Sequence, residues 1–269
     1  MDAIHISRTS RNFHMEDFNL LSMILSAMKW REKNGTITMM TDRAGAAYFQ
    51  KYKLEILWDR LDTRLDQLDP GINRDIFWAG GKLLALSVQK APCVMLDTDF
   101  IVWEKIDFTM ISQPLGVIHS EPLYPDVYPD SPDFYGIDDD FDWDICPCNT
   151  AFVYINDDAF LQYYTKKSID FMQKEYVSAD PLTYMVFAEQ RLFPMCAAKL
   201  KTPVYYFSDL ERLFDGNRLF THVWGFKEQM RQDYALRYDF CKRCMVRIKK
   251  DFPALIPVLE QIDILKQYL

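Results

Sequence analysis

The sequence has no hydrophobic run long enough to cross a membrane. No stretch of its 269 residues approaches the roughly 20 consecutive apolar residues of a transmembrane helix. The N-terminal segment MDAIHISRTSRNFH also lacks the apolar core of a secretory signal. We therefore expect a cytoplasmic protein without a transmembrane segment.

Basic residues are fewer than acidic ones. The chain has 31 Lys and Arg against 39 Asp and Glu, which gives a formal net charge of -8. Nucleic-acid-binding proteins usually carry a basic stripe, and none runs along this chain, so we expect no nucleic-acid partner. A short basic cluster from Lys242 to Lys250 is typical of a solvated helix face.

Cysteine is too sparse for a disulfide framework, with six residues in the whole chain. Cys241 and Cys244 have the spacing of half a zinc site. Cys146 and Cys148 have the wrong spacing to complete it, and no glycine flanks the first pair. We therefore expect reduced structural thiols rather than a zinc centre.

Linkers and repeats are missing as well. No Pro-, Gly- or Ser-rich tract divides the chain, and hydrophobic residues make up 49% of it, which is ample for a core. We predict one domain over residues 1–228 and a helical C-terminal extension over residues 229–269. That extension would pack on the core or on a partner. A homodimer and a peripheral contact with the inner face of a membrane are the further alternatives.

What the chain does have is an alternation of short apolar strands and amphipathic helices. This pattern predicts an α/β fold with a mixed, mostly parallel sheet flanked by helices. The aromatic and acidic stretch 120–144 breaks the alternation and is predicted to be a loop. The predicted strands are 3–7, 36–40, 55–57, 93–96, 116–119, 151–155 and 204–207. The predicted helices are 15–30, 44–52, 75–89, 158–176, 181–189 and most of 230–269.

The stretch CVMLDTDFIVWEKI ends an apolar strand on two aspartates, Asp97 and Asp99. Residues i and i+2 of an extended segment point to the same side, and ligands of open parallel sheets bind beyond the carboxyl ends of the strands. Two carboxylates that close need a cation, a proton or a basic group between them. Mn²⁺ or Mg²⁺ with substrate phosphate oxygens would satisfy the pair, and a solvated surface turn is the alternative.

Segments around this pair, in order along the chain, resemble the GT-A glycosyltransferases. WAGGKLLALSVQKAPCVMLDTDFIV places a helix with Lys82 before a strand that ends in Asp-x-Asp. PCNTAFVYI, with Asn149, is similar to the strand that follows in the family. Glu189-Gln190 resembles the acidic element near the acceptor. HVWGFK resembles the late His-x-x-Gly-x-x-Lys element of members that retain the anomeric configuration, such as bacterial capsule and surface-glycan enzymes.

Two departures from the family pattern stand out. The late element is one residue shorter between Gly225 and Lys227, and no Pro-Trp follows it. Thr150-Ala151 stands where many family members have a glycine. The first departure bears on the role of Lys227 and on the retaining outcome.

The resemblance implies a GT-A-like, metal-dependent glycosyltransferase. It would move a sugar from a nucleotide diphospho-sugar, with a UDP-sugar favoured, to a glycan or lipid-linked acceptor, and retention is slightly favoured. Asp97, Asp99 and His222 would bind Mn²⁺ or Mg²⁺. Glu189 would be a base if the enzyme inverts, or would flank the anomeric carbon with Gln190 if it retains, and Asn149 would face the sugar or the acceptor. The donor contacts are assigned to Arg8, Arg11, Asp42, Lys82, Asp97 and Lys227.

Two other functions fit part of the pattern. Nucleotidyl transfer also uses paired aspartates at a strand end, but it favours a Gly-rich phosphate loop, and HISRTSRN near the N-terminus has no glycine. A non-catalytic GT-A-like protein would bind a nucleotide or a glycan without turnover.

Overall fold

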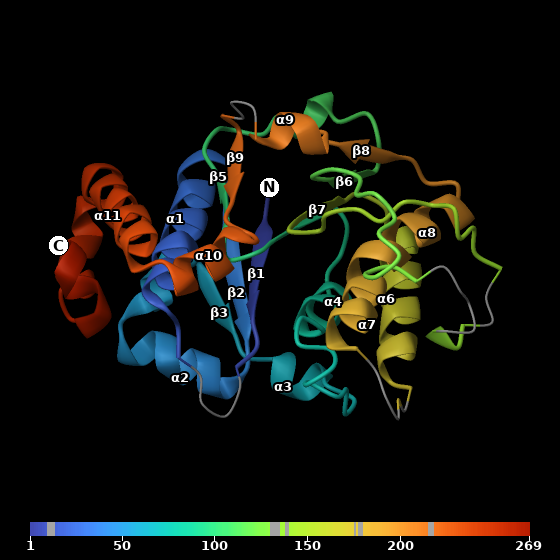
Figure 1. Ribbon diagram of the computed structural model, residues 1–269, viewed down its shortest axis with the longest axis horizontal. Helices are drawn as coiled ribbons and strands as arrows, with labels where there is room; N and C mark the ends of the chain where they lie inside the picture. Colours follow the sequence, from blue (N-terminus) through green and yellow to red (C-terminus); the bar gives the residue numbers. More distant parts are fainter. Residues whose placement is uncertain (10–13, 130–134, 138–139, 175, 177–179, 215–217) are drawn as a thin grey trace. The chain divides into compact units, whose positions relative to one another are not determined.

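The computed structural model describes residues 1–9, 14–129, 135–137, 140–174, 176, 180–214 and 218–269. The chain divides into two compact units. Unit 1 comprises residues 1–64, 96–106 and 218–269, and unit 2 comprises residues 65–95 and 107–217. The fold is mixed α/β with a mostly parallel sheet flanked by helices, as the alternation predicted (Figure 1).

Unit 1 is built on three parallel strands in the order β3-β2-β1. In register, Ala3 pairs with Ile37 at one end and Ser7 with Thr41 at the other. A separate antiparallel pair joins β5 to β9, with Phe100 opposite His222. These elements are β1 (Ala3–Ser7), β2 (Ile37–Thr41), β3 (Arg60–Asp62), β5 (Phe100–Val102) and β9 (Phe220–His222).

Helix α1 (Asp17–Lys33) is the central helix of unit 1. Its residues from Phe18 to Ala27 are buried except Asn19, as expected for a helix that is hydrophobic on nearly all sides. It packs against β2 and β5 on one side and α11 on the other (Figure 1). The remaining helices of the unit are α2 (Arg43–Lys51), η1 (Leu54–Leu57), α10 (Phe226–Gln232), α11 (Tyr234–Asp251), η4 (Pro253–Leu255), α12 (Ile256–Leu259) and η5 (Asp263–Tyr268).

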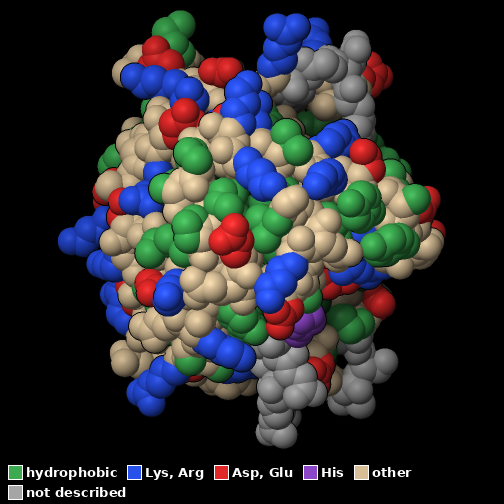
Figure 2. Space-filling view, turned by 90° about the vertical axis from the view of Figure 1, so that its left-hand side faces the viewer, with side chains coloured by type: hydrophobic (Ala, Val, Ile, Leu, Met, Phe, Trp, Pro, Cys, Tyr) green, Lys and Arg blue, Asp and Glu red, His purple; other side chains and the backbone are tan. Residues whose placement is uncertain are grey.

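The C-terminal helices pack on the rest of unit 1 through the apolar side of α11, where Cys241, Cys244, Met245 and Ile248 are buried. The Tyr268 hydroxyl also donates to a carboxylate oxygen of α1. On the face that carries α11, Lys and Arg side chains are spread among hydrophobic and acidic ones (Figure 2). The boundary at residue 228, a homodimer and a membrane contact stay predictions.

Unit 2 contains strands in the order β4-β7-β6-β8. Strand β6 runs antiparallel to β7 and parallel to β8, with Leu115 opposite Ile155 and Val204. The strands are β4 (Cys93–Leu96, whose last residue groups with unit 1), β6 (Leu115–Val117), β7 (Phe152–Ile155) and β8 (Val204–Tyr206). The helices are α3 (Leu65–Leu68), α4 (Gly81–Leu86), η2 (Phe108–Met110), α6 (Asp158–Met172), α7 (Pro181–Val186), the π-helix η3 (Phe187–Arg191), α8 (Leu192–Lys199) and α9 (Leu210–Phe214).

The predicted strand at 55–57 is wrong. Residues Leu54–Leu57 form a 3₁₀ helix, and the strand follows at Arg60–Asp62. Leu54 and Leu57 are buried three positions apart, which matches the three-residue turn of a 3₁₀ helix. Lys53, with φ 56°, turns the chain just before it.

The predicted helix at 75–89 is shorter in the structure, where α4 covers only Gly81–Leu86. The preceding residues form turns, and Gly80 donates to the Phe77 carbonyl. A Cβ atom on Gly80 would lie 3.0 Å from that carbonyl oxygen and 3.1 Å from the Met172 sulfur. The close approach of the turn to α6 therefore favours glycine at this position.

The described part of the predicted loop 120–144 is packed down by its own aromatic side chains. Tyr135 stacks on Phe187 with ring centroids 3.8 Å apart, and Trp143 stacks on the same ring at 5.9 Å. The buried Arg191 guanidinium donates to the Pro129 and Trp143 carbonyls, each at 2.8 Å. This loop is thus anchored to the π-helix η3.

Candidate metal and donor site

The Asp-x-Asp pair lies in the turn between β4 and β5. The Phe100 amide donates to the Asp97 carbonyl at 3.0 Å, which closes the turn. Because β5 pairs with β9, His222 lies opposite Phe100, and the Val223 amide donates to the Asp99 carbonyl at 3.2 Å. The antiparallel pair therefore brings the late His-containing segment to the aspartates.

One ligand atom from each of Asp97, Asp99 and His222 lies within 4.8 Å of the others. The side chains of Asp99 and His222 are buried, each 7% exposed, and Asp97 is half-buried. Two carboxylates and an imidazole form a donor set that suits a divalent cation. In the described part of the chain, no second group of three His, Cys, Asp or Glu side chains comes this close.

The Asp99 carboxylate has basic and polar neighbours within unit 1. The Lys227 Nζ lies 2.8 Å from Asp99 Oδ2, and the Trp224 amide donates to the same oxygen at 3.2 Å. The His222 Nε2 lies 3.8 Å from it. Lys227 reaches Asp99 from the first turn of α10, so the late predicted element contributes two side chains to this site.

Trp224 is a residue that the sequence motif left without a role. Its φ is 40°, in the left-handed region that non-glycine residues seldom adopt, and strain of this kind gathers at functional sites. Its ring stacks on that of His222, with centroids 6.0 Å apart and planes 8° from parallel. Trp224 as a whole is 44% exposed. Trp224 therefore lies parallel to the imidazole and contributes an amide to Asp99.

A buried polar chain lies behind the aspartate turn. The Trp58 Nε1 donates to His5 Nδ1 at 3.2 Å, which leaves the proton on His5 Nε2. That nitrogen donates to the Ser26 hydroxyl at 3.0 Å, and the hydroxyl donates to the Phe100 carbonyl at 2.5 Å. Burial lowers the pKa of His5 from 6.5 to about 3, against a smaller opposing effect of Asp99. The imidazole is therefore neutral at pH 7.

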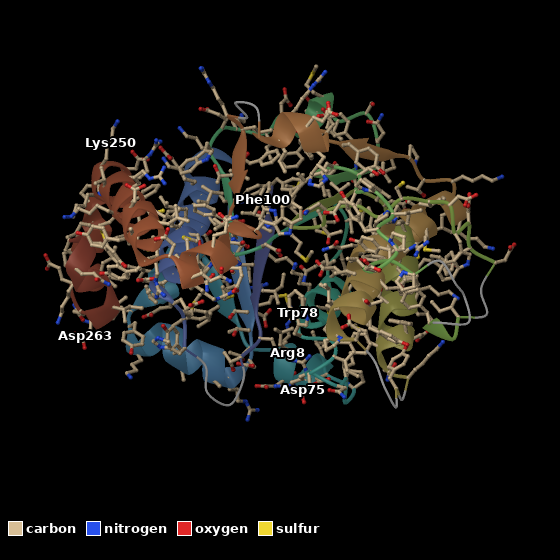
Figure 3. The ribbon with its side chains drawn as sticks, viewed as in Figure 1. Arg8, Asp75, Trp78, Phe100, Lys250 and Asp263 are labelled. Carbon is tan, nitrogen blue, oxygen red and sulfur yellow. The ribbon has the colours of Figure 1, made fainter. Side chains whose placement is uncertain are left out.

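Of the three predicted donor contacts near the N-terminus, the structure describes Asp42 and Arg8. The Asp42 carboxylate accepts from the Thr9 amide at 2.8 Å, and from the Thr9 hydroxyl and the Gly45 amide at 2.7 Å each. Asp42 thus caps α2 and holds the segment after β1. This structural role is separate from its predicted contact with the nucleotide base, which stays a prediction. Arg8 is half-buried in that segment (Figure 3). Arg11 lies outside the described residues.

Within unit 2, the structure brings Lys82 and Glu189 together. The Lys82 Nζ and the Thr150 hydroxyl each lie 2.8 Å from Glu189 Oε1, and the Glu189 side chain is only 3% exposed. Glu189 belongs to the π-helix η3, and π-helical turns inside α-helices are frequent at functional sites. The Tyr164 hydroxyl donates to the Glu189 carbonyl at 2.7 Å. The ammonium of Lys82 offsets the charge of a carboxylate that would otherwise be costly to bury.

A second polar group of unit 2 contains Asn149 and Gln190 together with Glu121, which sequence reasoning missed. The Asn149 amide donates to Glu121 Oε1 at 3.1 Å, and the Tyr128 hydroxyl lies 3.0 Å from Glu121 Oε2 and 2.7 Å from the Gln190 side chain. Gln190 Oε1 and the Glu121 carboxylate both accept from this hydroxyl, which has one proton to share between them. Burial and Glu121 raise the pKa of Tyr128 far above its ordinary value. The available signal was a carboxylate just after the predicted strand 116–119.

The predicted site residues thus form separate groups. Asp97, Asp99, His222 and Lys227 belong to unit 1, whereas Lys82, Asn149, Glu189 and Gln190 belong to unit 2. The half-site cysteines form no metal group: all six cysteines are free, and burial raises the pKa of Cys241 and Cys244 to about 12. No helix in the described ranges is long and apolar enough to span a membrane.

Residues 5–238 match the model of a protein family of unknown function, DUF6734. No curated protein matches the chain. Among solved structures, the chain is similar to the PaToxG glycosyltransferase, with 12% identity, coverage of 90% of this chain and 77% of that chain, and a TM-score of 0.47. It is also similar to mouse xyloside xylosyltransferase 1, with 9% identity, coverage of 77% and 85%, and a TM-score of 0.40. The similarity to the glycosyltransferase GlyE of Streptococcus pneumoniae TIGR4 has 13% identity and a TM-score of 0.39, and it covers 80% of this chain but only 46% of that one.

Proposed function

We propose that this chain, which belongs to the family of unknown function DUF6734, is a metal-dependent glycosyltransferase that moves a sugar from a nucleotide diphospho-sugar to an acceptor hydroxyl. The observation that carries the proposal is the group of Asp97, Asp99 and His222, with ligand atoms within 4.8 Å of one another. These side chains stand where the sequence resembles the Asp-x-Asp and late His-containing elements of the GT-A family.

Asp97, Asp99 and His222 would hold Mn²⁺ or Mg²⁺, and the bound ion would offset the negative charge that develops on the leaving diphosphate. Lys227 supplies a second positive charge at the same group, because its ammonium lies against Asp99. The Trp224 stack and the Trp224 amide hold His222 and Asp99 in place. Arg8 and Arg11 are assigned to phosphate contacts, and Asp42 to the base.

We assign the sugar side of the reaction to Asn149, Glu189 and Gln190. Lys82 and Thr150 both bind Glu189 Oε1. An ammonium at this distance favours the ionised carboxylate and makes it a weaker base towards an acceptor hydroxyl. This contact favours a positioning and charge-stabilising role for Glu189, and with it the retaining outcome. Lys82 then acts on Glu189 as well as on the donor.

The donor is a UDP-sugar in this proposal, and the acceptor is a glycan or a lipid-linked glycan, as in the synthesis of bacterial surface polysaccharides. The reaction would take place in the cytoplasm. Nucleotidyl transfer and non-catalytic nucleotide or glycan binding are the alternatives, and each predicts a different product.

The test is release of nucleoside diphosphate from a panel of UDP- and GDP-sugars, with and without Mn²⁺. The wild type is compared with Asp99→Asn and with Asp263→Asn, a control at the labelled surface aspartate of η5 whose side chain is 90% exposed (Figure 3). We expect UDP release that requires Mn²⁺, falls at least about 100-fold in Asp99→Asn and persists in the control. Pyrophosphate release from a nucleoside triphosphate and a sugar phosphate would instead identify a nucleotidyltransferase. Binding without any product would identify a non-catalytic protein.

A further inference from the structure

Lys227 occupies an unusual place for a residue near a group of metal ligands. Its Nζ lies 2.8 Å from Asp99 Oδ2, which is the distance of a charge-assisted hydrogen bond. The Asp99 side chain is 7% exposed and that of Lys227 is 28% exposed. The pair is therefore screened from water on the Asp99 side and open on the Lys227 side.

The same Asp99 oxygen faces the other members of the site. His222 Nε2 lies 3.8 Å from it, and the Trp224 amide donates to it. A divalent cation held by this carboxylate would lie a few ångströms from the ammonium and repel it, because like charges that close disfavour each other. The two cations are therefore competitors for Asp99.

We propose that Lys227 is a resident counter-cation for Asp99 that a divalent metal ion displaces, and that the displaced ammonium then binds the diphosphate of the donor. This inference rests on the proposed function. The lysine side chain suits both places, because it is a compact point charge on a flexible four-carbon stem. Its 28% exposure leaves the stem room to swing away from Asp99.

The proposal has a consequence that an ordinary diphosphate-binding lysine would not have. Removing the ammonium takes away a competitor of the metal and also a ligand of the diphosphate. Lys227→Gln should therefore strengthen binding of the metal alone and weaken binding of the nucleotide diphosphate in the presence of metal. A lysine with a merely structural role would weaken both when replaced.

The first experiment titrates Mn²⁺ into the full-length protein without nucleotide and follows free Mn²⁺ by electron paramagnetic resonance. We expect Lys227→Gln to bind Mn²⁺ about tenfold more tightly than the wild type, which corresponds to about 1.4 kcal/mol. Lys250→Gln is the matched control, because it removes the same charge from an exposed position on α11 (Figure 3) and should leave the affinity unchanged. Lys227→Arg keeps a cation beside Asp99 and should bind Mn²⁺ as weakly as the wild type.

The second experiment titrates UDP into the Mn²⁺-loaded proteins by calorimetry. We expect Lys227→Gln to bind UDP about tenfold more weakly, while Lys250→Gln matches the wild type. Opposite signs for Mn²⁺ and UDP support the displacement.

Equal or weaker Mn²⁺ binding by Lys227→Gln, at an unchanged melting temperature, would overturn the inference and leave the proposed glycosyltransferase intact. Absence of Mn²⁺ binding by both the wild type and Lys227→Gln would overturn the inference together with the metal site on which the proposed function depends.

Discussion

His5 is buried without charge, and this makes a quantitative prediction about the stability of the protein in mild acid. Its pKa is lowered from 6.5 to about 3 in the folded protein, mainly by burial. Between about pH 3 and pH 6.5, the unfolded chain therefore binds a proton on His5 and the folded chain does not. The stability that the neutral His5 contributes is therefore fully present above the pKa of the unfolded chain. It is lost as the pH falls from about 6.5 to about 3.

Between pH 7.5 and pH 5.0, His5 should lower the free energy of unfolding by about 2 kcal/mol. Each pH unit below the pKa of the unfolded chain contributes about 1.4 kcal/mol. Urea unfolding at the two pH values measures this loss in the wild type. His5→Gln has no titrating ring and should lose about 2 kcal/mol less than the wild type over the same interval. His14→Gln is the control, because His14 is exposed and its replacement should leave the pH dependence unchanged.

The comparison uses the difference in pH dependence, so a general destabilisation by His5→Gln does not affect it. Some destabilisation is expected, because the Trp58, Ser26 and Phe100 groups of the buried chain lose a partner. If the wild type and His5→Gln lost equal stability between pH 7.5 and 5.0, the buried neutral imidazole would be refuted.

Three further predictions concern other contacts. Lys82→Met removes the ammonium that offsets the charge of the buried Glu189 carboxylate, and it should destabilise the protein by about 3–5 kcal/mol in urea unfolding. Much of this loss should be recovered when Glu189→Gln is added, and an additive double variant would contradict the pairing. Tyr268→Phe removes the buried hydroxyl bond to Asp17 and should cost about 1–3 kcal/mol, whereas a melting temperature equal to that of the wild type would contradict this anchor. Paramagnetic Mn²⁺ should quench the fluorescence of Trp224, because the Trp224 ring stacks on the imidazole of His222. Trp224→Phe should therefore reduce the Mn²⁺-dependent quenching. Quenching of undiminished size would place the ion elsewhere.

The sequence was sufficient for the fold class and for placing Asp97, Asp99 and His222 in one candidate metal group. Strand ends are marked locally by an apolar run followed by polar residues, as at Asp97 and Asp99. The position of His222 followed from the order of motifs, and the structure brings it there through the pairing of β5 with β9. A local sequence pattern and the order of the motifs are thus enough to predict a feature when each motif is a continuous stretch of sequence.

Other features depend on long-range contacts that no local pattern encodes. The buried chain of His5, Ser26 and Phe100 joins β1, α1 and β5, and only the fold brings these elements together. Glu121 lay in a loop whose packing depends on Arg191. The segment at 54–57 has an apolar pattern that a strand and a 3₁₀ helix share, so its structure was ambiguous from sequence.

Asp42 illustrates a different difficulty. A carboxylate after a predicted strand suggested a contact with the nucleotide base, but an aspartate three residues before a glycine amide is also an N-cap, and its oxygens accept from Thr9 and Gly45. An aspartate at this position is compatible with both an N-cap and a nucleotide contact, and the sequence alone does not distinguish the two roles.

The most direct test of the metal-dependent donor site is calorimetric titration of UDP and GDP into the wild type, Asp99→Asn and the exposed control Asp263→Asn, each with and without Mn²⁺. We predict that the wild type and Asp263→Asn bind one of the two nucleotides only when Mn²⁺ is present, and that Asp99→Asn binds neither. Binding of the same strength without Mn²⁺, or undiminished binding by Asp99→Asn, would contradict a donor site built on Asp97, Asp99 and His222.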